Sequence, residues 1–123
     1  METVLVCVAP EAGYELYELW HQQLHGAGWE AHVLPVTEVG AELLPPVAAA
    51  VAQATDWPDE QLPVWLAAIR QAIGPRKRLL ALVPRPPASY SAETQALWNH
   101  ALGYGAKINE VVAVVNDILA GNL

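Results

Sequence analysis

The stretch Thr3-Val4-Leu5-Val6-Cys7-Val8 decides the fold. It is an unbroken run of apolar and β-branched residues, which is typical of a strand buried on both faces of a parallel sheet. The loop Ala9-Pro10-Glu11-Ala12-Gly13 ends this strand, and a helical pattern begins at Tyr14. Ligands of open α/β sheets bind just beyond the carboxyl ends of the strands, so residues 9–14 are where we expect a small-molecule site.

The chain then alternates between helical and strand patterns. Apolar residues recur at helical spacing from Tyr14 to Leu24, which predicts a helix closed by Gly26 and Gly28. Trp29 to Val36 predicts the second strand of a βαβ unit. The remaining predicted elements are a short helix within 37–42, a helix over 64–73, a buried strand over 78–84 and a helix over 92–102 capped by Ser91.

Two segments fit both a helix and a strand. The alanines of residues 47–55 favour a helix by propensity, but the sheet needs a third strand and no other segment supplies it, so we favour the strand. Residues 108–115 fit a fifth strand, whereas Ile108 to Leu119 fits a longer helix with one apolar face. The longer match favours the helix.

These elements predict an α/β fold of one domain, residues 1–123. Strands that alternate with helices build a three-layer, doubly wound parallel sheet, here of four or five strands. The length is sufficient for an ordinary hydrophobic core.

The composition limits the kinds of partner that we expect this protein to bind. Six basic and thirteen acidic residues give a net charge of -7, which repels nucleic acid and anionic lipid. No apolar run is long enough to span a bilayer. The single cysteine, Cys7, excludes an internal disulfide and fits a reducing compartment, so we expect a cytoplasmic protein with neither nucleic-acid nor membrane partners.

Three stretches carry a resemblance to a known superfamily. With the predicted element order, Val36-Thr37-Glu38-Val39, Thr55-Asp56-Trp57-Pro58 and Leu62-Pro63-Val64-Trp65-Leu66 resemble flavodoxins and NADPH-dependent FMN reductases. The resemblance implies a flavodoxin-like fold and FMN as a possible cofactor. On this topology a ligand site at the carboxyl edge would be lined by Pro10, Glu11, Gly13, Tyr14, Asp56, Trp57, Asp59, Arg85 and Tyr90.

The first loop departs from the flavoprotein pattern. Flavodoxins hold the FMN phosphate with hydroxyls and backbone N–H groups at a helix N-terminus. Here Pro10 removes one N–H, Glu11 adds a carboxylate, and no hydroxyl precedes Tyr14. We therefore expect no tight FMN binding.

Other resemblances share this topology. Residues 9–30 and 36–54 are similar to TIR domains, whose NAD-cleaving members imply roles for Trp57 and Glu60, although the expected serine is absent. Cys7 lies where low-molecular-weight tyrosine phosphatases and some phosphotransferase IIB domains place their nucleophile. The phosphatase arginine is replaced by Gly13, so we interpret Cys7 as a buried packing residue.

The remaining polar clusters are interpreted as solvated surface. Glu18, His21 and His25 share the outer side of the first helix, and residues 76–78 (Arg-Lys-Arg) form a turn opposite the expected ligand crevice. We predict no metal site.

The sequence thus indicates the fold more clearly than it indicates a functional site. We predict a flavodoxin-like module that binds or regulates a protein partner. The alternatives are an FMN- or nucleotide-binding oxidoreductase and a TIR-like NAD-binding domain. The wide apolar face of the last segment further predicts a homodimer or a partner docked on Ile108, Val111, Val112 and Val115.

Overall fold

The computed structural model describes residues 2–40, 44–103 and 105–121. The strands β1 (Thr3–Val8), β2 (Glu30–Pro35), β3 (Ala49–Gln53), β4 (Arg78–Leu82) and β5 (His100–Leu102) form one parallel sheet in the order β2-β1-β3-β4-β5. The helices are α1 (Tyr14–Gly26), α2 (Leu62–Ile73), α3 (Ala92–Gln95) and α4 (Ile108–Leu119), with 3-10 turns η1 (Val36–Glu38), η2 (Ala54–Asp56) and η3 (Pro87–Ser89). The predicted α/β, doubly wound parallel sheet is confirmed, with the strand order of flavodoxins.

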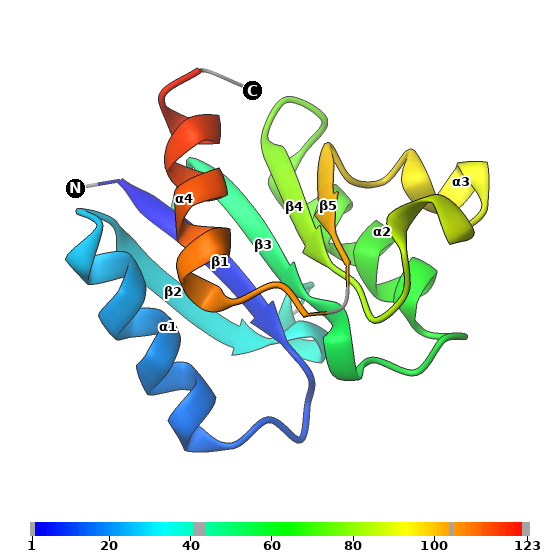
Figure 1. Ribbon diagram of the computed structural model, residues 1–123, viewed down its shortest axis with the longest axis horizontal. Coiled ribbons are helices and arrows are strands. Elements are labelled where there is room, and N and C mark those ends of the chain that lie inside the picture. Colours follow the sequence, from blue (N-terminus) through cyan, green and yellow to red (C-terminus); the bar gives the residue numbers. More distant parts are fainter. Residues whose placement is uncertain (1, 41–43, 104, 122–123) are drawn as a thin grey trace.

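Strand β1 divides the interior into two cores. Its alternate side chains Val4, Val6 and Val8 point to the face covered by α1 and α4, and Leu5 and Cys7 point to the face covered by α2. Figure 1 shows α1 and α4 on one side of the sheet and α2 on the other. Every residue from Val4 to Val8 is fully buried, so burial on both faces is confirmed.

Strand β3 confirms the favoured interpretation of residues 47–55. It pairs with β1 on one side and β4 on the other, and η2 follows it directly. Its alanines lie between helices on both faces of the sheet, so burial in the sheet outweighs their helix propensity. A short helix was predicted within 37–42. The structure has the 3-10 turn η1 there, which ends at Glu38, and residues 41 and 42 lie outside the described part.

The helix predicted over 92–102 is wrong in its second half. Ser91 caps α3 as expected, because its hydroxyl accepts a hydrogen bond from Thr94 N, but the helix ends at Gln95. Residues His100 to Leu102 form β5 beside β4 and give the sheet its fifth strand. The apolar spacing of this segment reflects packing of Leu97 and Trp98 onto the core beneath α3 rather than a helix face.

Helix α4 confirms the favoured helix over 108–119 but corrects its predicted role. Val111, Val112 and Val115 are buried against β1, β3 and β4 of the same chain. The apolar face is wide because α4 packs against α1 as well as the sheet. These three valines are therefore covered within the domain and are not available to a second copy or a partner.

None of the helices in the described part has the length and apolar character that a bilayer crossing requires.

Arg70 joins three elements at the end of α2. Its guanidinium donates to Leu97 O from Nε and Nη2 at 3.1 and 3.0 Å, and to Asn99 Oδ1 at 2.8 Å. Nη1 donates to the carbonyl oxygens of Gly74 and Lys77 at 3.1 and 2.7 Å. Asn99 in turn pairs with Leu79, accepting from its N at 2.8 Å and donating to its O at 2.9 Å. This network fixes the start of β5 beside β4.

We predict that Arg70→Lys lowers the free energy of unfolding by about 2 kcal/mol, because an ammonium group cannot replace the forked bonds to Leu97 and Asn99. Urea denaturation followed by circular dichroism measures this loss. Arg76→Lys is the matched control, since Arg76 is exposed. Equal midpoints for the two variants would contradict the role assigned to Arg70.

Candidate functional site

The carboxyl ends of β1 and β3 enclose a pocket of about 410 Å³. Strand β1 pairs with β2 on one side and with β3 on the other, so the strand order reverses at β1. This position is the switch point at which doubly wound sheets bind ligands. The pocket lies beside the first turn of α1. Its lining residues are Ala9, Glu11, Ala12, Gly13, Leu16, Gln53 and Asp56.

The loop after β1 is shaped by its own backbone. Ala12 N donates to Ala9 O at 3.0 Å, which closes a turn over Pro10 and Glu11. Gly13 follows in an extended conformation and begins α1 without a side-chain cap. The loop therefore offers backbone and a carboxylate, but no hydroxyl, to a ligand.

Gln53 forms the polar end of β3 within this pocket. Its Oε1 accepts a hydrogen bond from Trp20 Nε1 of α1 at 2.9 Å, and its Nε2 donates to Thr55 Oγ1 at 3.0 Å. Both ends of the amide are thus held by the protein itself. Gln53 was not among the predicted site residues, although it is the one strongly polar residue between Val47 and Ala54 and stands out for that reason.

The charge of the pocket is negative. Glu11 and Asp56 are exposed and are the charged residues among those that line it. A phosphate dianion would meet two carboxylates with no lysine or arginine to balance it, so the described lining does not fit a phosphate. No group of three or more His, Cys, Asp or Glu in the described residues could hold a metal ion.

The nine predicted site residues separate into two groups. Glu11, Gly13 and Asp56 come together in the switch-point pocket, with Pro10 exposed in the adjoining loop. Tyr14 begins α1 but is 75% exposed and does not line the pocket.

The second group lies around α2 and the loop after β4. Trp57 is only 3% exposed and packs edge to face on Trp65, with ring centroids 5.3 Å apart. Arg85 stands over the Tyr90 ring at 4.5 Å and reaches Asp59 at 3.7 Å. Trp57 and Tyr90 are buried in the core, which corrects the expectation that they line a ligand site at the carboxyl edge.

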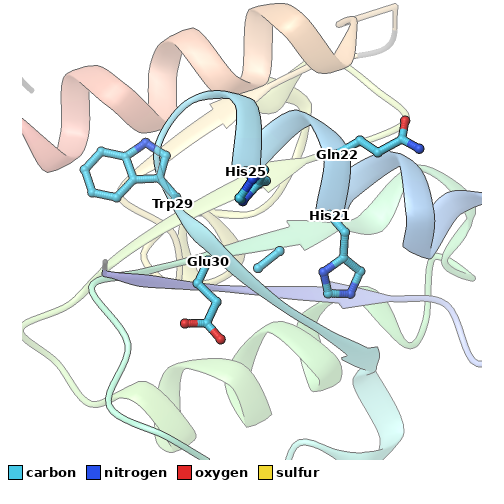
Figure 2. Close-up of a pocket in the computed structure, with 6 residues that line it drawn as sticks. His21, Gln22, His25, Trp29 and Glu30 are labelled. Carbon is cyan, nitrogen blue, oxygen red and sulfur yellow. The ribbon is translucent and has the colours of Figure 1, made fainter.

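A second pocket of about 490 Å³ lies at the outer edge of the sheet and was not predicted. Figure 2 shows His21 and His25 of α1 on one side of it and, on the other, Glu30 at the start of β2 and Trp29 just before it. A hydrogen bond to α4 holds the Trp29 side chain in place, because its Nε1 donates to Asn116 Oδ1. Both histidines are exposed, as expected for the outer side of α1.

Cys7 is a packing residue in the core, as interpreted from the sequence. Burial raises the pKa of its thiol to about 12, so the thiolate needed for nucleophilic attack does not form near neutral pH. A phosphatase-like role for Cys7 is therefore incompatible with the structure.

We predict that native protein leaves Cys7 unmodified by a thiol reagent such as DTNB at pH 8, whereas protein in urea reacts stoichiometrically. The raised pKa also makes stability depend on pH. The unfolded thiol ionises near its usual 9.0, so the native state loses stability as the pH rises from about 9 towards 12. Over this range the free energy of unfolding should fall less in Cys7→Ala than in the wild type. Rapid labelling of the folded protein would contradict this account.

Comparison with known proteins identifies the fold. The sequence matches no protein-family model and none of the curated proteins. Among solved structures, it superposes on a response regulator receiver domain from Clostridium thermocellum with a TM-score of 0.73 at 12% identity, covering 99% of this chain and 97% of that one. A sensor protein from Polaromonas sp. JS666 gives 0.71 at 14%, covering 99% and 98%. A CheY-like receiver domain from Methylobacillus flagellatus gives 0.68 at 16%, covering 96% and 98%.

These likenesses show an α/β, flavodoxin-like fold of the kind found in CheY-like receiver domains. They do not single out the flavodoxins, FMN reductases or TIR domains that the sequence resembled. The coverage of nearly the whole of both chains means that the match extends over the complete sheet and its helices.

Proposed function

We propose that this chain is a regulatory domain that acts by binding a protein partner. The observation that carries the proposal is the likeness to response regulator receiver domains over nearly the whole chain. These similar structures are receiver domains of response regulators, and the proposal extends a regulatory role to this chain.

The chemistry of the switch-point pocket supports a binding role over a catalytic one. The residues that line it supply two carboxylates and one amide, but no hydroxyl, thiol, imidazole or cation. The amide of Gln53 is already engaged at both ends, and the one cysteine is buried. A serine, threonine, cysteine or lysine nucleophile paired with a base is absent from the described residues that line this pocket.

The flavin and NAD alternatives find less support. An FMN-type oxidoreductase would need a phosphate cradle where Glu11 and Asp56 lie. A TIR-like reaction would use Trp57 beside the ligand, but Trp57 is buried against Trp65.

We predict that FMN at micromolar concentration leaves the melting temperature unchanged, since two carboxylates repel its phosphate. Differential scanning fluorimetry over an FMN series measures this. A saturating rise in melting temperature would indicate binding to the native state and would support the flavin alternative instead. Heat denaturation of freshly purified protein should likewise release no flavin.

The binding role itself is tested by identifying and rebuilding the complex. Tagged protein is crosslinked in its own cells, the partner recovered in stoichiometric amount is expressed separately, and isothermal titration calorimetry measures the pure pair. We expect saturable binding with a fixed stoichiometry. If no recovered protein binds again in pure form, the regulatory proposal is wrong.

The rebuilt complex also shows whether the buried face of α4 takes part. Val111 and Val115 are covered by the sheet, so a partner must contact other residues. Hydrogen exchange with and without partner should therefore change at exposed positions, while the amides of α4 that face the sheet keep their protection.

A further inference from the structure

The basic residues of this acidic protein gather at the amino edge of the sheet. Four of the six lysines and arginines lie between residues 70 and 78, at the end of α2 and the start of β4. The rest of the chain holds two basic and all thirteen acidic residues. The cluster is thus a local exception to the charge of the molecule.

Three of these four cations are not needed by the fold. The guanidinium of Arg70 donates hydrogen bonds to backbone carbonyl oxygens and to Asn99, as described above. Arg76, Lys77 and Arg78 are exposed, and among the described residues their side chains form no hydrogen bond or ion pair. Unpaired exposed cations in a row cost stability through mutual repulsion, so a partner that neutralises them gains from binding here.

A partly apolar groove lies beside Lys77. Two adjoining hollows of about 350 and 300 Å³ share Pro45, Pro46, Val47 and Lys77. The hollow nearer α2 is completed by Leu44, Ala72 and Ile73, and the hollow nearer β1 by Glu2, Thr3 and Ala48. Two prolines in the wall have no N–H to donate, so an occupant would be held by apolar contact and by the cations rather than by pairing with these residues.

We propose that this groove, with Lys77 in its wall and the exposed Arg76 and Arg78 next to Lys77 in the chain, binds an acidic polypeptide segment that carries apolar side chains. This inference rests on the proposed regulatory role and assigns it a surface. The three exposed cations of residues 76–78 outnumber the one carboxylate in the wall, Glu2, so charge complementarity favours an anionic occupant, and the apolar part of the walls favours one with apolar side chains. A nucleic acid fits less well, because its long phosphate backbone would extend over the acidic remainder of the surface.

The test uses a fluorescein-labelled peptide in which two leucines stand among glutamates, titrated with the protein and followed by fluorescence anisotropy. Lys77→Glu should weaken binding about five- to tenfold, since it replaces attraction by repulsion at the shared wall of both hollows. Lys107→Glu is the matched control: it makes the same charge change at an exposed position before α4, and we expect binding within about twofold of wild type.

A second variant tests the groove without altering charge. Ala72 is exposed in α2, and Ala72→Gln keeps a good helix former while it fills the hollow nearer that helix. This variant should weaken binding of the peptide severalfold and leave the midpoint of urea unfolding unchanged. Absence of peptide binding to the wild type, or equal losses for Lys77→Glu and Lys107→Glu, would overturn the inference. So would tighter binding of poly(U) RNA than of the peptide.

The rebuilt complex separates this inference from the regulatory role. If the purified partner binds Lys77→Glu as well as it binds wild type, the domain binds a protein through another surface and only the groove assignment fails. If no partner binds the wild type, the regulatory role fails.

Discussion

Burial of β1 on both faces is the constraint on which the rest of the structure depends. A strand whose alternate side chains enter two separate cores requires helices on both sides of the sheet, and the connections then have to run from one layer to the other. At about 25 cal/mol per Å², the apolar area of Val4 to Val8 alone contributes several kcal/mol to stability. The loop after β1 must consequently emerge at the switch point, next to the end of β3.

The sequence was most informative where burial alone determines structure. Continuous apolar runs predicted β1 and β4, and helical spacing predicted α1, α2 and α4. The segment after α3 was predicted wrongly because its structure depends on partners distant in the chain. Arg70 and Leu79 hold Asn99, and Trp98 packs edge to face on Tyr90 with centroids 5.8 Å apart. No local pattern in residues 96–102 reports these contacts.

The candidate site was predictable in place but only partly in composition. Topology located it at the loop after β1, where Glu11, Gly13 and Asp56 do meet. It could not show which way a side chain turns: Trp57 and Tyr90 follow strands at the same edge, yet both fold back into the core beside α2 and α3. The polarity of Gln53 stands out in the sequence, but its role could not be predicted because it depends on Trp20, thirty-three positions earlier in the chain. The width of the α4 face was likewise ambiguous until α1 was seen beside it.

The two ends of the sheet differ in charge, because the cations of residues 76–78 outnumber the carboxylates Glu2 and Glu30 at the amino edge. Glu11 and Asp56 lie at the carboxyl edge, and the exposed cations of residues 76–78 lie at the amino edge, a full strand length away. Such a separation gives the molecule a permanent electric dipole along the strands. An approaching charged macromolecule would exert a torque on this dipole and turn the domain before any contact forms. The rate of encounter would then depend on ionic strength more steeply than the final affinity does. Salt screens charges over about 8 Å, so it weakens the long-range torque but leaves the short-range contacts of the complex in place.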